Sequence, residues 1–172
     1  RSARLPLLLF KLSMLEASPL KELERIPLFS TCDSEGNPFS REILLGSRYL
    51  LFFYPRDNTP GCIAEACGLR DNYNFFQNKN IQVFGISGDS VQSHEKFKRK
   101  YDFPFPLLLD ENNHIAKTFG VLGKKKFMGR VYEGIHRTSF LINENGIIEK
   151  TFLKVKAKTH ASDLIVELNL NT

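Results

Sequence analysis

The stretch RYLLFFYPRDNTPGC, residues 48–62, is a run of large apolar residues that ends in a turn and a cysteine. An uninterrupted apolar run bounded by turn residues is typical of a strand that is buried on both faces of a sheet. The runs IQVFGIS (81–87) and TSFLI (138–142) have the same character. We therefore predict three buried strands.

Helical patterns alternate with these strands. Residues 62–78, residues 90–101 and the segment after Thr159 carry apolar side chains at helical spacing. Asp89 and Gln92 are placed as a capping box before the second helix. Asn145-Gly146, between two apolar runs in residues 139–152, predicts a β-hairpin. This order predicts an α/β fold with helices on both faces of the sheet, and chemistry beyond the carboxyl ends of the strands.

The size and composition are those of one ordinary domain of 172 residues. We expect residues 14–172 to form it. Residues 1–13 are expected to be an extension outside the fold, either foreign to the natural sequence or truncated, with a targeting remnant as the weaker alternative. No apolar run approaches the ~20 residues that span a bilayer, so we expect a soluble protein without a membrane partner.

The net charge of +5 is concentrated in three short basic runs: residues 96–100, 124–126 and 154–158. A nucleic-acid-binding protein would interleave such runs with aromatic residues or carry a recognisable motif. We expect solvated surface at all three runs and no nucleic-acid partner. Salt-dependent DNA binding would favour the alternative.

The residues after the first strand prepare the start of a helix. Thr59 is a good N-cap, Pro60 suits the first helical position, and Gly61 allows a close turn. Cys62 then falls among amide N–H groups without helical partners, at the positive end of the helix dipole. We expect this thiol to ionise more readily than that of a free cysteine. Glu65, one turn later on the same face, opposes this unless a cation neutralises it.

A second cysteine, Cys67, follows Cys62 by five residues. In an intact helix this spacing separates the two Cα atoms by roughly 8.5 Å, whereas a disulfide needs about 4.4–6.8 Å. The two thiols are therefore either unrelated or form a switch whose helix must unwind before they pair.

The stretch FYPRDNTPGCIAEAC, residues 53–67, resembles the active site of peroxiredoxins of the bacterioferritin comigratory protein (peroxiredoxin Q) group. Pro55, Thr59 and Cys62 match the family pattern Pro-x-x-x-Thr-x-x-Cys, and Cys67 matches the second cysteine of many members. Residues 86–121 and 132–165 are similar to the second half of the family. The resemblance runs from about residue 25 to the C-terminus and is absent over residues 1–13.

The resemblance implies a thioredoxin-like fold with a central mixed sheet, and a thiol peroxidase. Cys62 would be the peroxidatic cysteine and Cys67 the resolving cysteine. Thr59 would hold the peroxide, and Pro55 would shield the pocket from water. Arg137 matches the family arginine beside the thiolate.

Two further residues support this implied site. Glu65 matches a common acidic position whose charge would orient Arg137, and backbone N–H groups near Gly61 would help to stabilise charge on the departing oxygen. Cys62 would become a sulfenic acid, and Cys67 would condense with it before a second peroxide over-oxidises the sulfur.

The resemblance also implies partners: hydrogen peroxide and organic hydroperoxides as substrates, and thioredoxin or a similar dithiol as reductant. It implies a cytoplasmic protein, and we expect a monomer, with a dimer as the alternative. Two alternatives remain open for the thiols. In the first, the chain is a one-cysteine peroxidase whose sulfenic acid is resolved by an external thiol. In the second, it is a peroxide sensor or chaperone that uses the same switch.

The remaining cysteine and the histidines carry no predicted chemistry. Cys32 is interpreted as a small buried hydrophobic residue, and His94 as a packed histidine. A structural zinc site typically has a C-x₂₋₄-C spacing with two further ligands, and the sequence lacks this pattern. We expect neither a metal nor an organic cofactor.

Overall fold

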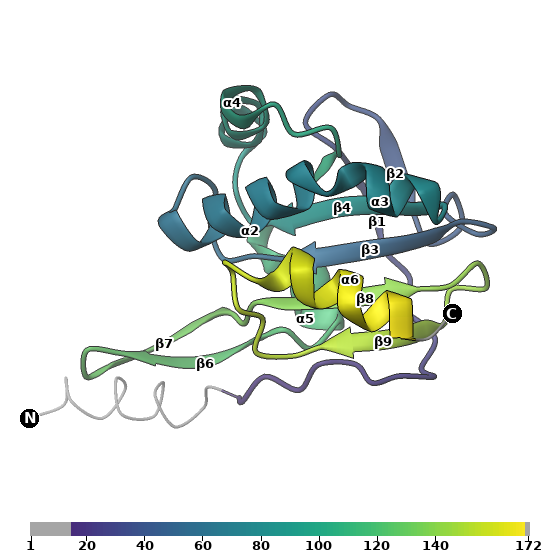
Figure 1. Ribbon diagram of the computed structural model, residues 1–172. Helices are drawn as coiled ribbons and strands as arrows, with labels where there is room; N and C mark the ends of the chain where they lie inside the picture. Colours follow the sequence, from purple (N-terminus) through teal and green to yellow (C-terminus); the bar gives the residue numbers. More distant parts are fainter. Residues whose placement is uncertain (1–14, 171–172) are drawn as a thin grey trace, which may run out of the picture.

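A mixed five-stranded sheet forms the centre of the computed structural model, which describes residues 15–170 (Figure 1). Its strand order is β5-β4-β3-β8-β9. Strand β3 pairs in parallel with β4 and antiparallel with β8. The strands are β3 (Arg48–Phe53), β4 (Ile81–Ser87), β5 (Leu107–Leu109), β8 (Thr138–Ile142) and β9 (Ile148–Phe152). The three predicted buried strands are confirmed.

Helices cover both faces of this sheet, as predicted. Helices α2, α3 and α6 lie on one face, and α5 lies on the other (Figure 1). The helices are α2 (Pro60–Asp71), α3 (Tyr73–Asn78), α4 (Val91–Tyr101), α5 (His114–Thr118) and α6 (His160–Leu170), with a 3₁₀ turn η1 (Glu111–Asn113) before α5. The architecture is the expected thioredoxin-like α/β fold.

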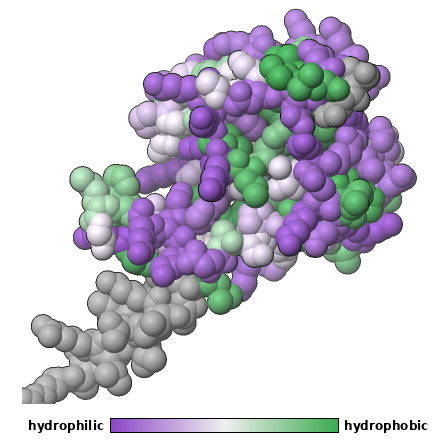
Figure 2. Space-filling view, turned by 60° about the horizontal axis from the view of Figure 1, so that its bottom comes forward, coloured by the Kyte–Doolittle hydropathy of each residue, from purple (hydrophilic) through white to green (hydrophobic). Residues whose placement is uncertain are grey.

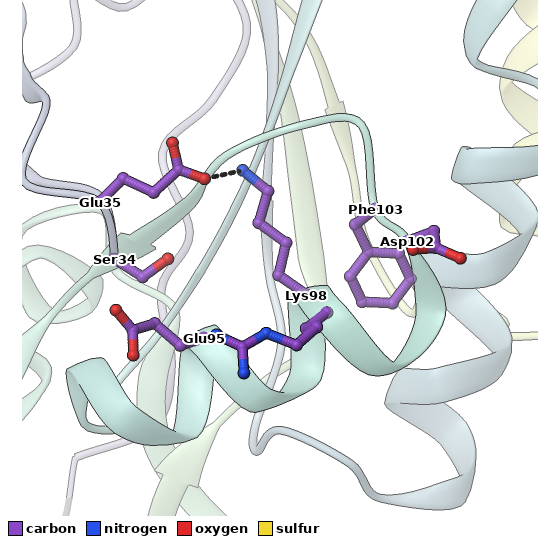
Figure 3. A pocket seen from close by; sticks show the side chains of 7 residues that line it. Ser34, Glu35, Glu95, Lys98, Asp102 and Phe103 are labelled. Atoms are coloured by element: carbon purple, nitrogen blue, oxygen red, sulfur yellow. Dashed lines mark hydrogen bonds and ion pairs between the residues drawn. The ribbon is translucent and has the colours of Figure 1, made fainter.

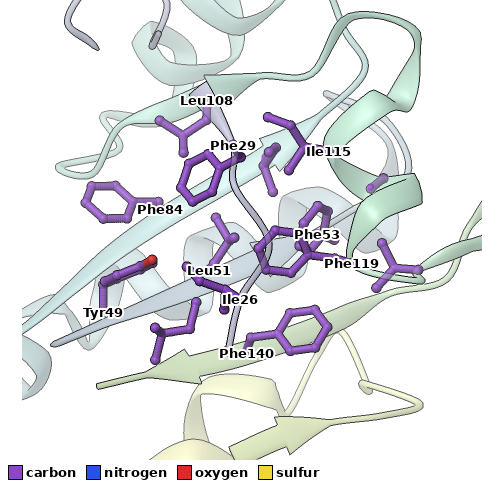
Figure 4. Packing of buried hydrophobic residues seen from close by; sticks show 14 of the residues in the cluster. Ile26, Phe29, Tyr49, Leu51, Phe53, Phe84, Leu108, Ile115, Phe119 and Phe140 are labelled. Atoms are coloured by element: carbon purple, nitrogen blue, oxygen red, sulfur yellow. The ribbon is translucent and has the colours of Figure 1, made fainter. Parts of the chain in front are cut away.

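Strand β3 supplies side chains to two separate hydrophobic cores. Leu51 and Phe53 belong to the core beneath α5, which is shown in Figure 4. Leu50 and Phe52 belong to the core beneath α2 and α6. Because successive side chains of a strand point to opposite faces, a strand covered on both faces needs an apolar residue at every position. That requirement explains the uninterrupted run.

The predicted helix over residues 62–78 is wrong in one respect, because it is two helices. Asn72 separates α2 from α3 with a non-helical backbone (φ −110°, ψ 16°). Its side-chain amide donates a hydrogen bond to the carbonyl of Gly68 at 2.8 Å. An asparagine that bonds to nearby backbone competes with the helix, so apolar periodicity alone did not reveal the break.

The start of α4 also differs from the predicted capping box. Ser90 is the N-cap, and its hydroxyl accepts a hydrogen bond from the Ser93 N–H at 3.2 Å. Asp89 instead bonds to the loop that precedes α2. The apolar side chains of residues 90–101 are also not all buried, since Val91 is 38% exposed, whereas Phe97 is buried. His94 is fully buried, as expected of a packed histidine.

Three hairpins complete the fold of residues 15–170. The predicted one joins β8 and β9, with Gly146 at φ +75° in its turn. A short one joins β1 (Ser30–Cys32) and β2 (Pro38–Ser40). The third joins β6 (Leu122–Phe127) and β7 (Arg130–Ile135), and the sequence analysis missed it. Met128 and Gly129 in its turn both have positive φ, as a type I′ turn requires, but Met-Gly is a weaker signal than Asn-Gly.

The outer surface is largely hydrophilic, with separate hydrophobic groups of side chains rather than one continuous patch on the face shown in Figure 2. Cys32 is half-buried, so its interpretation as a buried residue is only partly right. Across residues 15–170, no helix is both long and apolar enough to cross a membrane. The predicted extension, residues 1–13, lies outside the described residues and stays a prediction.

Candidate active site

Cys62 lies in the first turn of α2, directly after the loop that leaves the carboxyl end of β3. It is the third residue of the helix and is 2% exposed. Thr59 occupies the N-cap position with an extended backbone, but among the described residues its side chain makes no capping bond. Its hydroxyl donates instead to the carbonyl of Arg56 at 3.0 Å. The half-buried Pro55 lies in the same loop.

A guanidinium lies beside the thiol. Nη2 of Arg137, just before β8, donates to Sγ of Cys62 at 3.3 Å, and Nη1 forms an ion pair with Oε2 of Glu65. A Cβ at Gly61 would lie 3.1 Å from Nη2 of Arg137, tighter than most real Cβ contacts. Glycine at position 61 therefore gives the guanidinium room to reach the sulfur. The fold brings together residues that are 75 positions apart in the sequence.

Glu65 is a buried carboxyl with only one of its oxygens bonded. It is 1% exposed, and its Oε1 has no hydrogen-bond partner among the described residues. Burial raises the pKa of Glu65 to about 7, although the charge and hydrogen bond of Arg137 act to lower it. For Arg137, burial acts to lower the pKa, but the charges of Glu65 and Cys62 and their hydrogen bonds raise it overall. The guanidinium therefore keeps its charge beside the sulfur.

Cys67 lies on the same intact helix and is half-buried. All three cysteines of the chain are free thiols. Burial raises the pKa of Cys67 and outweighs the opposing charge of Arg70. The second cysteine is therefore held as a neutral thiol in this state, and the helix keeps it apart from Cys62.

One lysine of a basic run lies near this site, which corrects the expectation of plain solvated surface. The ammonium of Lys125 donates to the carbonyl of Ile135 at 2.8 Å and is half-buried. Burial lowers its pKa, and so does the charge of Arg137, while the charge of Cys62 acts to raise it. Its neighbour Lys124 on β6 is also half-buried, whereas Lys126 is exposed, so only tertiary structure shows which lysine faces the thiol.

A charged hollow of about 380 Å³ lies elsewhere, between the β1–β2 turn and α4 (Figure 3). Lys98 spans it and donates to Glu35 at 3.0 Å. None of the residues predicted to carry chemistry lines this hollow. We therefore place the candidate site at the first turn of α2.

Comparison with known proteins agrees with this geometry. The profile of the AhpC/TSA family matches residues 23–151. The chain belongs to this family. Peroxiredoxin Bcp of Escherichia coli K12 is 42% identical over 143 residues, which is 83% of this chain and 92% of that protein. The chain is thus a peroxiredoxin of the Bcp group, a thiol peroxidase among the oxidoreductases.

Solved structures of the same group share the fold. A PrxQ variant of Xylella fastidiosa has a TM-score of 0.83 at 28% identity and covers 90% of this chain and 98% of its own. The bacterioferritin comigratory protein of Xanthomonas campestris, described together with its alkyl peroxide reduction activity, has a TM-score of 0.78 at 28% identity. The alignment covers 86% of this chain and 99% of the Xanthomonas chain.

Proposed function

We propose that this peroxiredoxin reduces hydrogen peroxide and organic hydroperoxides through Cys62, and that Cys67 resolves the product. The observation that carries the first part is the guanidinium of Arg137, 3.3 Å from the Cys62 sulfur at the start of a helix. The alkyl peroxide reduction named for the Xanthomonas relative supports organic hydroperoxides as substrates.

In the first step the Cys62 thiolate attacks one peroxide oxygen, an S–O bond forms, and the O–O bond breaks. The electron pair of the broken bond goes to the departing oxygen, which takes up a proton and leaves as water or an alcohol. A fixed guanidinium and backbone N–H groups stabilise that developing charge without reorganisation. Thr59 would orient the peroxide through its hydroxyl, which bonds to the Arg56 carbonyl in this state, and Pro55 would shield the pocket.

In the second step the Cys67 thiol attacks the sulfenic sulfur of Cys62, and water leaves as the disulfide forms. The first turns of α2 must unwind for this, and three features favour unwinding. Thr59 gives the helix no side-chain cap among the described residues, which forgoes about 1 kcal/mol. Gly68 lies inside the helix and destabilises it by roughly 0.5–1 kcal/mol relative to alanine. The unbonded oxygen of Glu65 regains water once the helix opens.

A dithiol such as thioredoxin would then reduce the disulfide, becoming a disulfide itself and restoring both thiols. We place this cycle in the cytoplasm, where thiols are kept reduced. The three free cysteines are consistent with that compartment.

The proposal is tested by mass spectrometry of non-reduced peptides after one equivalent of hydrogen peroxide. We expect a loss of two hydrogens within the peptide that holds Cys62 and Cys67. In the Cys62→Ser variant turnover disappears, while Cys67→Ser still undergoes the first oxidation but stops cycling with thioredoxin. A persistent Cys62 sulfenic acid beside a free Cys67 in the wild-type chain would instead mean a one-cysteine enzyme with an external resolving thiol.

A further inference from the structure

The loop between β3 and α2 contains a buried aspartate that the proposed chemistry does not use. Asp57 lies between two exposed residues, yet its side chain is only 2% exposed. Its Oδ1 accepts a hydrogen bond from the Tyr54 hydroxyl at 2.6 Å. Its Oδ2 lies 2.6 Å from Nδ1 of His94 and accepts the Ser93 hydroxyl at 2.9 Å.

His94 faces hydrogen-bond acceptors with both ring nitrogens. Nδ1 meets the carboxylate of Asp57, and Nε2 lies 2.9 Å from the carbonyl oxygen of Leu108. A neutral imidazole carries one N–H and cannot donate to both, whereas an imidazolium can. Burial acts to lower the pKa of His94, but the hydrogen bond and charge of Asp57 raise it overall. The pair is therefore an ion pair, and the His94 side chain is 0% exposed.

The backbone of the same loop is tied down as well. The N–H of Asp57 donates to Oδ2 of Asp89 at 2.9 Å, and that oxygen also accepts the Ser87 hydroxyl. The ligand atoms of Asp57, Asp89 and His94 lie within 4.8 Å of one another. Because His94 donates from both ring nitrogens, it has no lone pair to offer a metal. We therefore interpret Asp57, Asp89 and His94 as a structural anchor for the loop. It links the loop to β4, α4 and β5.

We infer that the Asp57–His94 ion pair positions the loop that carries Thr59 and begins α2, and that it stays formed while α2 unwinds. The inference rests on the proposed peroxidase cycle. Thr59 follows Asp57 by two residues and Cys62 follows it by five, so a shift of the anchor moves the peroxide-binding hydroxyl and the thiol together. The anchor contacts lie outside α2 and need not break when the helix opens. Asp57 and His94 are therefore positioning residues of the first step.

The test separates the two steps in the Asp57→Asn variant by rapid quenching and mass spectrometry of Cys62. Removing one partner leaves the other charge buried and uncompensated, and a small displacement of reacting groups slows a reaction by up to about 100-fold. We expect Cys62 oxidation to slow by about 10- to 100-fold, while conversion of sulfenic acid to disulfide keeps its wild-type rate within about twofold. Simple loosening of the structure would speed that second step. The control is Glu149→Gln, which breaks the bidentate Arg48–Glu149 pair and should change neither rate.

Two further measurements keep the inference open to refutation if Asp57→Asn does not fold. Ser93→Ala removes one bond to the carboxylate without stranding a charge, and it should slow oxidation by a smaller factor. Nitrogen NMR of the reduced wild-type chain at pH 7 should show two ring N–H groups on His94, and a single one would overturn the ion pair. A wild-type chain whose Cys62 does not react would sink the proposed function and this inference with it. If the wild type reacts with peroxide and a folded Asp57→Asn variant reacts equally fast, only the inference about the Asp57–His94 pair is refuted.

Discussion

Replacing Gly68 with alanine should slow disulfide formation without changing the reaction with peroxide. Gly68 is interior to α2, immediately after Cys67. Among the described residues, a Cβ there would meet only the Ala161 Cβ, at an ordinary contact distance of 3.6 Å. Alanine therefore fits and stabilises the helix by roughly 0.5–1 kcal/mol. If residue 68 unwinds when Cys67 moves, this lowers the population of the open form by about two- to fivefold.

The assay is quench-flow mass spectrometry that follows the Cys62 sulfenic acid into the Cys62–Cys67 disulfide. We expect its rate to fall by about two- to fivefold, with more over-oxidised Cys62 at high peroxide, because the sulfenic acid lives longer. The matched control is Asn74→Ala, which raises helix propensity at an exposed site of α3 and should leave the rate unchanged. Disulfide formation at the wild-type rate in a correctly folded Gly68→Ala variant would refute the reasoning that the opening segment includes residue 68.

Three further predictions concern the charges around the thiol. Arg137→Lys should slow Cys62 oxidation by about 100-fold, because an ammonium cannot contact both Cys62 and Glu65 as the guanidinium does. Stopped-flow measurement of the oxidation rate tests this prediction. A less than threefold effect would contradict the role of Arg137. Since burial raises the pKa of Glu65 in the folded chain to about 7, above its ordinary value of 4.5, its contribution to stability is full below pH 4.5 and is lost as the pH rises through 7. This amounts to about 3 kcal/mol, and urea unfolding of wild type against Glu65→Gln should show it. The opposite holds for His160, because burial lowers its pKa from 6.5 to about 4. Its contribution to stability is present above pH 6.5 and is lost as the pH falls through 4. In His160→Gln the free energy of unfolding should therefore vary less with pH over that range.

The sequence predicted the frame of the molecule because its strands are buried on both faces. The run YLLFFY, residues 49–54, can be recognised as a buried strand from the sequence alone, since every position carries a large aliphatic or aromatic side chain. The local signals at Pro60 and Gly61 likewise place Cys62 in the first turn of a helix. These features depend on neighbours in the chain, and for that reason they are visible in one sequence.

Other features depend on residues far apart and could not be predicted. In the sequence, Asp57 is an ordinary turn residue. Only the structure shows that its carboxylate contacts the His94 ring, 37 positions later. The expectation of a packed histidine was right about burial and silent about its charge. Lys125 reads as surface because two further lysines flank it. Only the β6–β7 pairing brings its ammonium to the Ile135 carbonyl, close to Arg137 in the sequence.

In the proposed cycle, oxidation itself loosens the helix. The contact between the Arg137 guanidinium and the Cys62 sulfur is strongest while the sulfur is a thiolate, because a charge-assisted bond is roughly twice as strong as a neutral one. Conversion to a neutral sulfenic acid removes that attraction from a helix for which Thr59 makes no side-chain capping bond within the described part of the chain. The group that promotes peroxide attack therefore releases the helix once the attack is complete. If the loop at Asp57 stays fixed, as we infer, the unwinding is confined to α2, the helix that carries both Cys62 and Cys67.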